Sequence, residues 1–207
     1  MESKQKDYFS EKAEGFDGQK SITQNVDNIG QLVLKELSFS NNMHIMDFGS
    51  GTGLLLSQIA PFVRDITAVD ISASMIGVLQ SKMDTIDCNV QILELDLTKE
   101  TLDTKFDAII SSMTIHHIEN VQEIFNIFYS LLKDNGTIAI ADLDKEDGSF
   151  HSENTGVFHN GFNRNEFLQI AKNAGFKDLK IQTASIMNKP TGKYPVFLLT
   201  GKKKNYC

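Results

Sequence analysis

The sequence of 207 residues has little cysteine, no excess of positive charge and no long apolar run. Its only cysteines, Cys88 and Cys207, suit neither a disulfide framework nor a cysteine-rich metal site, which predicts a reducing compartment. Acidic residues outnumber basic ones by 27 to 20, and the net charge of -7 argues against broad binding to nucleic acid or anionic membranes. No stretch approaches the roughly 18 apolar residues of a membrane span, and residues 1–7 lack the apolar core of a signal peptide. We therefore expect a cytoplasmic protein with a small-molecule partner and no membrane partner, whereas no oligomeric state is predicted.

What is present is an alternation of strand-like and helix-like segments. Short apolar runs typical of buried strands occupy residues 45–48, 66–69, 90–95, 108–110 and 137–141. Helical segments are expected at residues 22–37, 72–83, 121–132 and 163–174. This alternation predicts an α/β fold with a parallel sheet and crossover helices.

Local signals mark several ends of these segments. Ser72 is placed to cap the second helix, Asn135 and Gly136 form a tight turn into the fifth strand, and Gly175 ends the last helix. Two final strands are expected at residues 179–186 and 196–200, joined by a loop that contains Pro190 and Pro195. That loop is short enough for an antiparallel pair.

A glycine-rich turn from Met46 to Gly53 lies between the first strand and an apolar helix, with three glycines spaced two apart. Glycine adopts positive φ and lets a ligand approach the main chain, so this turn predicts a bound polar or anionic group. The dinucleotide pattern needs a third glycine at position 54, which is Leu54, and a P-loop needs Lys followed by Ser or Thr after Gly53. Both patterns fail, and a turn that merely joins strand to helix is the remaining alternative.

Two carboxylates favour a ligand over a plain turn. Asp70 ends the second strand and Asp96 follows the third, and ligands of open α/β sheets bind beyond the carboxyl ends of strands. Asp70 could accept both hydroxyls of a ribose, and Asp96 could accept a hydrogen bond from an adenine amino group. Because Asp70 and Asp96 follow successive strands, a shared ligand site explains them better than two unrelated, solvent-exposed acids would.

With these residues the chain resembles the class I S-adenosylmethionine-dependent methyltransferases of the small-molecule type. The residues that carry the resemblance are 47–53, Asp70, Asp96, Leu97 and 106–110, which lead to His116 and His117. The resemblance covers nearly the whole chain and implies a Rossmann-like sheet of seven strands, mostly parallel, with helices on both faces and an antiparallel last strand. It also implies one domain over residues 1–207. Its parts are a lid and helical segment (1–40), a cofactor-binding core (41–142) and an acceptor-side insertion with the terminal strands (143–207).

The family pattern further implies which residues bind S-adenosylmethionine. Around the methionyl part these are Asp47, which orients the amino group, then Gly49, Ser50, Gly51, Thr52 and Gly53, with Ser111, Ser112 and Met113 as the floor. Around the adenosine they are Asp70 on the ribose, Ile71 and Met75 beside the adenine, and Asp96 with Leu97 at its edge. The aromatic lead-in with Tyr8 and Phe16 resembles a segment that folds over the cofactor, where ring faces attract the sulfonium. Anchoring of the N-terminal segment is the alternative role for these rings.

Methyl transfer from a sulfonium needs alignment of the acceptor and exclusion of water rather than a covalent enzyme intermediate. An acceptor that loses a proton could give it to His116 or His117, after the fourth strand, or to His151. Packing of one histidine of the adjacent pair into the core is the alternative. The polar segment 142–162 is the expected acceptor site.

No metal is predicted. The candidate calcium ligands are Asp142, Asp144, Glu146 and Glu153, but Asp147 stands where an EF-hand needs glycine, and a strand precedes the segment. The histidines that could gather in the folded chain are His116, His117, His151 and His159, and their spacing matches no standard zinc pattern.

The acceptor is the least determined part of the prediction. Methyltransferases of base amino groups often carry Asn or Asp followed by Pro-Pro and an aromatic after the fourth strand, where this chain has residues 111–114, Ser-Ser-Met-Thr. Together with the acidic charge this favours a small molecule, with protein or RNA as the competing acceptors. Two further functions compete with methyl transfer. They are an NAD-dependent oxidoreductase, which Leu54 disfavours, and an S-adenosylmethionine-binding protein without transferase activity.

Overall fold

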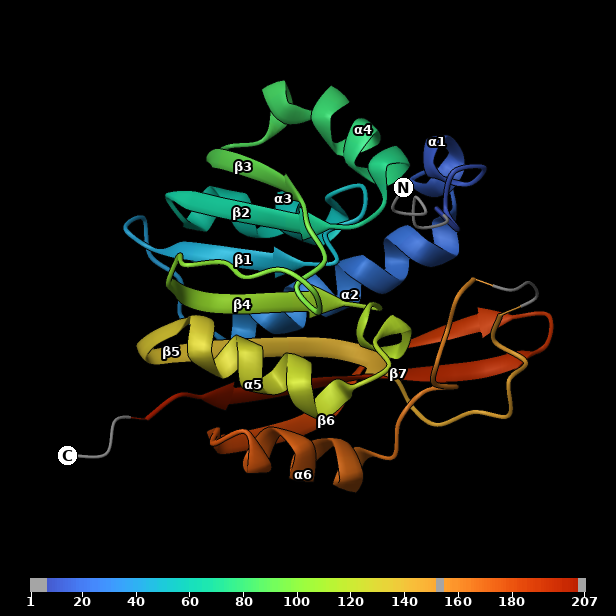
Figure 1. Ribbon diagram of the computed structural model, residues 1–207. Helices are drawn as coiled ribbons and strands as arrows, with labels where there is room; N and C mark the ends of the chain where they lie inside the picture. The colour runs from blue at the N-terminus through green and yellow to red at the C-terminus, as the bar shows by residue number, and fades with distance from the viewer. Residues whose placement is uncertain (1–6, 152–154, 205–207) are drawn as a thin grey trace.

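A computed structural model of the protein describes residues 7–151 and 155–204, and within them seven strands form one sheet (Figure 1). The strands are β1 (His44–Phe48), β2 (Asp65–Asp70), β3 (Asn89–Glu94), β4 (Phe106–Ser112), β5 (Leu132–Leu143), β6 (Lys177–Lys189) and β7 (Gly192–Lys202). Their order is β3-β2-β1-β4-β5-β7-β6. Strands β1 to β5 pair in parallel, whereas β7 inserts antiparallel between β5 and β6. The expected mostly parallel sheet with an antiparallel last strand is confirmed.

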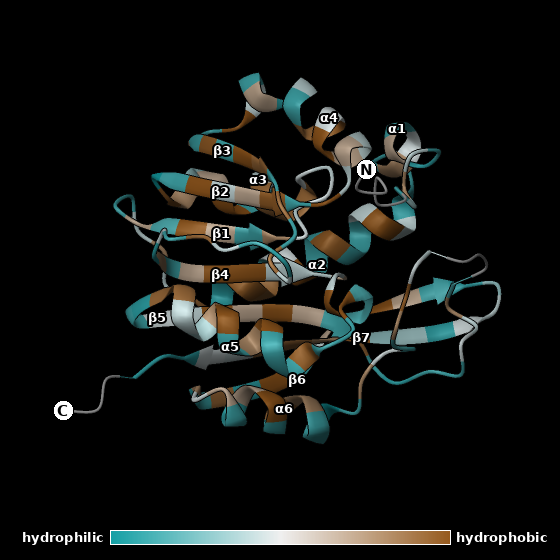
Figure 2. Cartoon of the chain, viewed as in Figure 1, coloured by the Kyte–Doolittle hydropathy of each residue, from teal (hydrophilic) through white to brown (hydrophobic). Residues whose placement is uncertain are grey.

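Helices cover both faces of this sheet, as expected. The α-helices are α1 (Ala13–Phe16), α2 (Lys20–Glu36), α3 (Leu54–Ile59), α4 (Ala73–Ser81), α5 (Val121–Leu131) and α6 (Arg164–Asn173). Short 3₁₀ turns are η1 (Ala60–Phe62), η2 (Met83–Thr85) and η3 (Ile115–His117). In Figure 1, α5 and α6 lie in front of the sheet and α2 and α3 behind it. The colours of Figure 2 show the apolar central strands enclosed between these layers.

Apolar residues at helical spacing hold the two helical layers against the sheet. In α2, Ile29 and Val33 are fully buried in one apolar cluster, together with Leu56 of α3. In α5, Phe125 and Phe128 belong to a second cluster on the other face. Burial of each such side chain stabilises the fold by roughly 1.5 to 3 kcal/mol.

The local end signals are present for two helices. The Ser72 hydroxyl accepts the backbone N–H of Met75 at 3.2 Å and caps α4 as predicted. After α6, Gly175 adopts a φ of 106°, a conformation in which a residue with a Cβ is strained. Both ends therefore lie where the sequence placed them.

Two details of the later strands differ from expectation. Strand β5 begins at Leu132, so Asn135 and Gly136 lie inside it rather than in a turn before it. The register of pairing between β4 and β5 changes at these residues, and Asn135 has a φ of 62°. Asn135 and Gly136 therefore interrupt the regular strand. Pro195 lies in β7 rather than in a loop. It pairs with Ile186 of β6, beyond the last β7 residue that pairs with β5, because the two final strands extend past the rest of the sheet.

The carboxyl ends of the parallel strands face two long irregular segments. In Figure 1 the strands β1 to β3 point toward the N-terminal segment, and the chain between β5 and α6 lies on the same side. The N–H of Phe158 in that chain donates to the carbonyl of His116 at 3.0 Å. Among the described residues, no helix has both the length and the apolar character that a membrane span requires.

Candidate active site

The glycine turn after β1 adopts a conformation that other residues enter only with strain. Gly49, Gly51 and Gly53 have φ values of 68°, 53° and 82°. A Cβ on Gly49 would lie 2.2 Å from the side chain of Thr114, whereas a Cβ on Gly51 would meet no atom within 4 Å. Gly51 thus leaves open space beside its main chain, which a ligand can fill.

Asp70 holds this turn from the end of β2. Its carboxylate accepts the N–H of Gly51 at 2.7 Å through Oδ2 and the N–H of Ser72 at 2.8 Å through Oδ1. Burial raises the pKa of Asp70, although the hydrogen bonds from Ser72 and Gly51 oppose that effect. Each carboxylate oxygen can accept a further hydrogen bond, so Asp70 can both fix the turn and bind a ligand.

A cavity of about 920 Å³ opens beside this turn. Of the residues predicted to bind cofactor, its lining includes Tyr8, Phe16, Asp47, Gly49, Ser50, Gly51, Thr52, Asp70, Ile71, Met75, Asp96, Leu97, Ser112 and Met113. Ser111 and Gly53 lie outside the lining. Ser111 is fully buried, and its hydroxyl donates to the carbonyl of Phe48 on the neighbouring strand β1 at 2.7 Å. Gly53 instead packs against Leu79, which a Cβ would approach to 2.4 Å.

The cavity contains polar atoms that are buried and lack a hydrogen-bond partner within the described part of the chain. These atoms are Asn25 Oδ1, Asp47 Oδ2, Ser50 Oγ, Ser112 Oγ and His151 Nε2. A buried polar group without a partner costs about 1 to 3 kcal/mol. Their concentration in one cavity indicates that a polar ligand supplies the missing partners.

Asp47 is the most perturbed of these groups. Burial raises its pKa to about 8, the neighbouring charge of Asp70 adds to the rise, and a hydrogen bond from the N–H of Leu56 opposes it. The carboxyl is therefore largely protonated at neutral pH until a cation lies beside it.

Asp96 lines the cavity with its oxygens already in use. Oδ1 accepts from the N–H and the hydroxyl of Thr98 at 3.0 and 2.6 Å, and Oδ2 pairs with Lys99 at 2.7 Å. Burial alone would raise the pKa of Asp96, but the hydrogen bonds from Lys99 and Thr98 lower it on balance. The side chain stays ionised, and a bond to an adenine amino group would be an additional one.

The N-terminal segment closes one side of the cavity and is fastened to α4. Asp7 accepts the hydroxyl of Ser72 at 2.9 Å and both the hydroxyl and the N–H of Ser74, at 2.7 and 3.2 Å. Tyr8, with 38% of its surface exposed, packs on Gly156, where an added Cβ would lie 2.8 Å from the ring. The segment therefore bridges the first turn of α4 and the chain that follows β5.

Three predicted proton acceptors meet in the cavity lining, where the ring of Phe9 lies 5.7 Å from that of His117. The ring of His116 lies 4.4 Å from that of His117 and 5.2 Å from that of His151, measured between centroids. Nδ1 of His116 is 2.7 Å from Oδ1 of Asp142, and both side chains are almost completely buried. Asp142 Oδ2 also accepts the backbone N–H of His116 at 3.1 Å. The carboxylate thus fixes the orientation of His116 and leaves only its Nε2 for other partners.

The other two histidines are neutral at physiological pH. Burial lowers the pKa of His117 to about 4, repulsion from His116 adds to this, and a hydrogen bond from the ring to the carbonyl of Gly156 opposes it. Burial and repulsion from His116 and His117 likewise lower the pKa of His151 to about 4. Both rings are therefore in the form that can accept a proton.

Comparison with known proteins decides the family. A family model described as a methyltransferase domain matches residues 22–181, which is more than half of the chain. The chain belongs to the class I S-adenosylmethionine-dependent methyltransferases. The matched span contains the glycine turn, Asp70, Asp96 and the adjacent histidines, so the resemblance seen in those residues is confirmed at the level of the family.

Curated relatives are similar to this chain over much of its length. An uncharacterized methyltransferase of Schizosaccharomyces pombe is 32% identical over 158 residues, covering 68% of this chain and 56% of that protein. Phosphoethanolamine N-methyltransferase 1 of Zea mays is 27% identical over 172 residues, covering 78% of this chain and 34% of that protein. The chain thus spans about half, or less, of the length of these curated relatives.

The same fold is found among solved structures. Phosphoethanolamine N-methyltransferase 2 of Haemonchus contortus, in complex with S-adenosyl-L-methionine, superposes with a TM-score of 0.72 at 16% identity. The alignment covers 95% of this chain and 60% of that one. At this identity the likeness concerns the fold.

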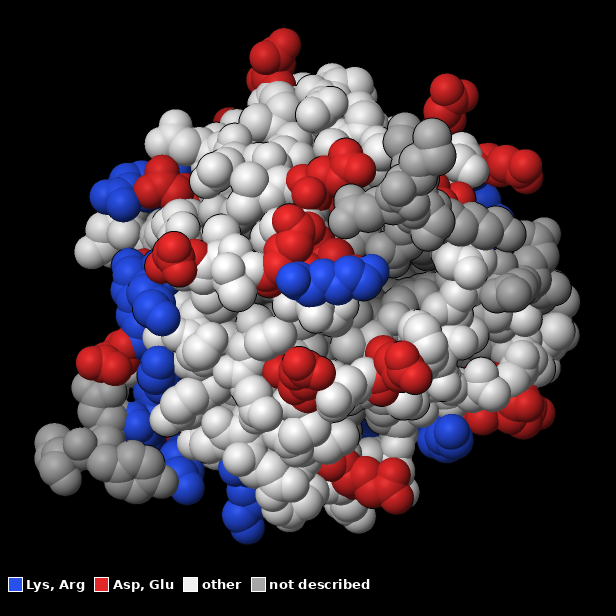
Figure 3. Space-filling view, in the orientation of Figure 1, with Lys and Arg blue, Asp and Glu red and all other residues white. Residues whose placement is uncertain are grey.

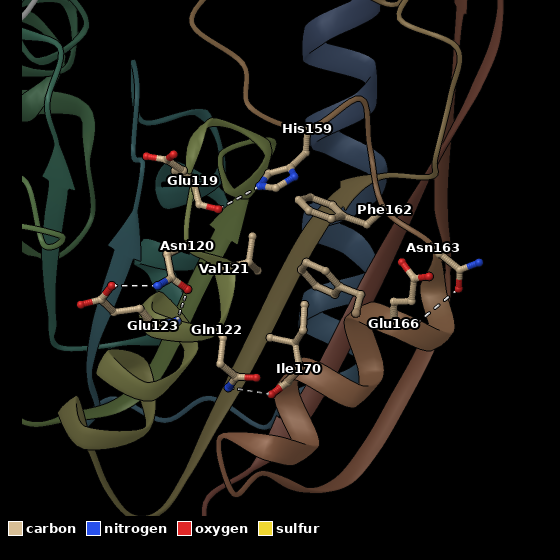
Figure 4. A pocket seen from close by; sticks show the side chains of 11 residues that line it. Glu119, Asn120, Val121, Gln122, Glu123, His159, Phe162, Asn163, Glu166 and Ile170 are labelled. Carbon is tan, nitrogen blue, oxygen red and sulfur yellow. Dashed lines mark hydrogen bonds between the residues drawn. The ribbon is translucent and has the colours of Figure 1, made fainter.

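A second cavity, of about 710 Å³, lies between the start of α5, α6 and the chain at residues 159–163 (Figure 4). Several of its polar side chains form hydrogen bonds with each other or with the main chain. His159 Nε2 lies 2.9 Å from the carbonyl of Ile118, and Gln122 donates to the carbonyl of Ile170 at 3.3 Å. Of the unpartnered buried polar atoms in the described residues, none belongs to this lining. The cavity beside the glycine turn is therefore the better ligand site.

The acids considered as calcium ligands have other partners. Asp144 forms a two-bond ion pair with Arg164, at 2.6 and 2.8 Å, and Glu146 accepts the N–H groups of Gly148 and Phe150. Glu153 lies outside the described residues. Within residues 7–151 and 155–204, no three histidine, cysteine or acidic side chains are grouped so that they could hold a metal ion.

Most of the basic side chains visible in Figure 3 lie along the left of the molecule, with single ones near the centre and at the lower right. In the same orientation, Figure 1 shows the strands β1, β2 and β3 beginning there, away from the carboxyl ends that border the cavity. On this face, the arrangement does not form a basic surface that leads to the cavity.

Several residues that line the cavity were not predicted from the sequence. Asn25, on the apolar face of α2, has only 3% of its surface exposed and lines the cavity. A polar residue between Ile22 and Val26 on that face could have been recognised in the sequence as a candidate ligand-binding residue. Asp7 and Lys189 carried no such signal. Only the fold brings the N-terminal segment and the end of β6 to the cavity.

The raised pKa of Asp47 predicts a pH-dependent loss of stability. Because the folded pKa lies above the unfolded value of 3.8, Asp47 favours folding at low pH, and this contribution disappears as the pH rises toward 8. Between about pH 5 and about pH 8, we expect the ligand-free wild type to lose at least about 1 kcal/mol more stability than Asp47→Asn. Urea unfolding at both pH values measures this difference, and equal losses in the two proteins would contradict the buried environment assigned to Asp47.

The position of Tyr8 predicts a role in holding the cofactor. Loss of a ring face near a cation costs about 0.5 to 2 kcal/mol, so Tyr8→Ala should raise the dissociation constant of S-adenosylmethionine about two- to thirtyfold. Because Tyr8 is partly exposed, the melting temperature should change little. Calorimetric titration tests this against Phe62→Ala, an exposed aromatic residue that does not line the cavity. Unchanged affinity in Tyr8→Ala would remove the lid role.

Proposed function

We propose that this methyltransferase transfers the methyl group of S-adenosylmethionine to a small-molecule acceptor by in-line displacement. The observation that carries the proposal is the set of buried, unpartnered polar atoms beside the glycine turn, in a chain of this family. They belong to residues that line the same cavity as Gly51, whose missing Cβ leaves room for a ligand against the main chain.

These residues fit the charge and shape of the cofactor. Asp47 Oδ2 and Asn25 Oδ1 are acceptors that suit the ammonium group of the methionyl part, and Ser50 Oγ can donate to its carboxylate. Asp70 would accept the ribose hydroxyls, with Ile71 and Met75 beside the adenine. When bound, S-adenosylmethionine supplies an activated methyl group on a sulfonium sulfur.

The chain's own contribution is to exclude water and to receive a proton. Aromatic side chains from four parts of the fold line the cavity, namely Tyr8, Phe9, Phe16, Phe48, Phe150 and Phe158. His151 Nδ1 lies 3.2 Å from the hydroxyl of Thr155. If Nδ1 donates its hydrogen there, the unpartnered Nε2 presents a lone pair that can take a proton from the acceptor. His117 is a second acceptor in the same wall, and Asp142 positions His116 between them.

Three observations favour a small molecule over a protein or RNA acceptor. The N-terminal segment and the chain after β5 both border the cavity, so a bulky acceptor has less access than a small one. The relative from Zea mays is named for methylation of phosphoethanolamine, which is a small molecule. The net charge of -7 also opposes RNA binding.

The proposal is tested by turnover. Purified protein is incubated with S-adenosylmethionine and a panel of small amines, alcohols, thiols and carboxylates, and released S-adenosylhomocysteine and methylated product are identified by mass. We expect release that depends on one class of acceptor and, at a cofactor concentration below saturation, is reduced in Asp70→Asn. Parallel incubations contain peptide or RNA in place of the small acceptors, and release only in those would contradict the small-molecule assignment. Cofactor binding without release with any acceptor would show a binding protein instead of a transferase.

A further inference from the structure

Asp47, near the carboxyl end of β1, is a buried acid with few partners. Only 1% of its surface is exposed. The N–H of Leu56 donates to its carboxyl group, and Oδ2 has no hydrogen-bond partner within the described part of the chain. No basic side chain in residues 7–151 and 155–204 forms an ion pair with it. Because a buried charge without a counter-ion is strongly disfavoured, the carboxyl group is stable in its protonated, neutral form.

Of the two neighbouring acids, Asp47 is the better holder of a proton. Burial raises the pKa of Asp70 too, but the N–H groups of Ser72 and Gly51 donate to its carboxylate at 2.8 and 2.7 Å and favour the ionised form. Asp70 also keeps some contact with solvent, whereas Asp47 has almost none. Burial, and then repulsion from ionised Asp70, raise the pKa of Asp47 to about 8.

The other charged groups around the cavity do not supply the missing cation. The residues of α2 and α3 that line it carry no charge. Within the described structure, Asp70 is the one charged group that shifts the titration of Asp47. The remaining charged or titratable side chains of the lining are Asp7, Tyr8, Lys12, Asp96, His116, His117, His151 and Lys189.

The cofactor itself carries a cation that suits this position. In the complex proposed above, the ammonium group of the methionyl part lies beside Asp47 and Asn25, whose Oδ2 and Oδ1 atoms lack partners. An adjacent opposite charge favours the ionised form of a carboxyl group. Asp47 therefore prefers a proton while the cavity is empty and prefers to be ionised when the ammonium group is bound.

We infer that cofactor binding is coupled to the release of a proton from Asp47. In the ligand-free protein the carboxyl group holds this proton. Its O–H bond breaks as the ammonium group binds, the proton passes to solvent, and the carboxylate stays ionised in an ion pair with the ligand. This inference rests on the proposed function and concerns the regulation of the same site by pH.

The number of released protons is measured by calorimetric titration with S-adenosylhomocysteine at pH 6.5. The titration is run in phosphate, which has a small ionisation enthalpy, and in bis-tris, which has a large one, because the difference in heat gives the protons taken up by the buffer. The amino group of the ligand is already protonated at this pH. We expect the wild type to release at least about 0.5 proton per bound ligand.

A second ligand and two variants assign the proton. The ligand 5′-methylthioadenosine keeps the adenosine and the sulfur but lacks the amino acid part, so its binding should release no proton. Asp47→Asn keeps the volume of the side chain and should bind S-adenosylhomocysteine without proton release. The matched control is Asp96→Asn, which replaces a lining acid that is already ionised because hydrogen bonds from Lys99 and Thr98 outweigh its burial. This control should release as many protons as the wild type.

The same coupling makes cofactor affinity depend on pH. Because the ionised form of Asp47 binds the ligand, affinity rises with pH and levels off above about pH 8. The dissociation constant of S-adenosylhomocysteine should be at least about threefold lower at pH 7 than at pH 6 in the wild type, and nearly equal at both pH values in Asp47→Asn. His117 and His151, with pKa values of about 4, stay neutral over this range.

The outcomes separate this inference from the function on which it rests. Tight binding of S-adenosylhomocysteine without proton release would overturn the coupling and leave the cofactor site intact. Equal release with 5′-methylthioadenosine, or unchanged release in Asp47→Asn, would overturn the assignment to Asp47 and indicate Asp70. If Asp47→Asn binds too weakly to titrate, the comparison of the two ligands in the wild type decides. Failure of the wild type to bind S-adenosylhomocysteine at any pH would contradict the proposed function together with the coupling.

Discussion

Replacing Asp70 with asparagine is expected to raise the dissociation constant of S-adenosylmethionine at least about tenfold, which corresponds to about 1.4 kcal/mol. The carboxylate has two tasks in the structure. It accepts the N–H groups of Gly51 and Ser72, and it stands where the family pattern places the ribose. Asparagine keeps the shape but turns one acceptor into a donor, so one of the two N–H groups would face another N–H. Both the ribose contact and the conformation of the glycine turn should suffer.

The measurement is a calorimetric titration of the variant and of Asp134→Asn, an exposed acid near the beginning of β5 and away from the cavity. The control variant should bind like the wild type. Far-ultraviolet circular dichroism at the titration temperature establishes that both variants are folded. An unchanged dissociation constant in Asp70→Asn would mean that the ribose is bound elsewhere.

Replacing Asp142 with alanine is expected to lower the free energy of unfolding by about 3 to 5 kcal/mol. The carboxylate is fully buried and accepts three donors, which are His116 Nδ1 at 2.7 Å, the N–H of His116 at 3.1 Å and the N–H of Leu143 at 2.7 Å. Alanine leaves all three without a partner in a site that water does not reach. The loss should therefore exceed that of a typical surface ion pair several times over.

Urea unfolding compares this variant with Asp178→Ala, which breaks the exposed pair with Lys204 and should cost no more than about 1 kcal/mol. A second variant, Asp142→Asn, keeps the volume and distinguishes loss of the charge from creation of a hole. A cost below about 1 kcal/mol for Asp142→Ala would show that the surrounding donors find other partners and that Asp142 does not fix His116.

The path of the chain through the sheet was largely predictable, because short-range patterns encode it. Apolar runs, helical spacing and a cap such as Ser72 are properties of neighbouring residues, so β1 to β5 and the helices between them lie close to their expected positions. The irregularity at Asn135 and the place of Pro195 in β7 were not predictable in this way. Both depend on which strand lies alongside, and the insertion of β7 between β5 and β6 came from the family resemblance rather than from spacing.

For the site, the sequence by itself determined the glycine turn and the acids after β2 and β3, since the carboxyl ends of parallel strands meet at one edge. It also provided the histidines as candidates, but not their contact, which joins η3 to a residue 34 or 35 positions later in the chain. Only the tertiary structure decided that Asp47 is buried without a partner for Oδ2, that Ser111 lies outside the cavity lining, and that Lys189 belongs to it. Burial and hydrogen-bond satisfaction arise from residues far apart in the sequence. Such properties exist only once the chain is folded.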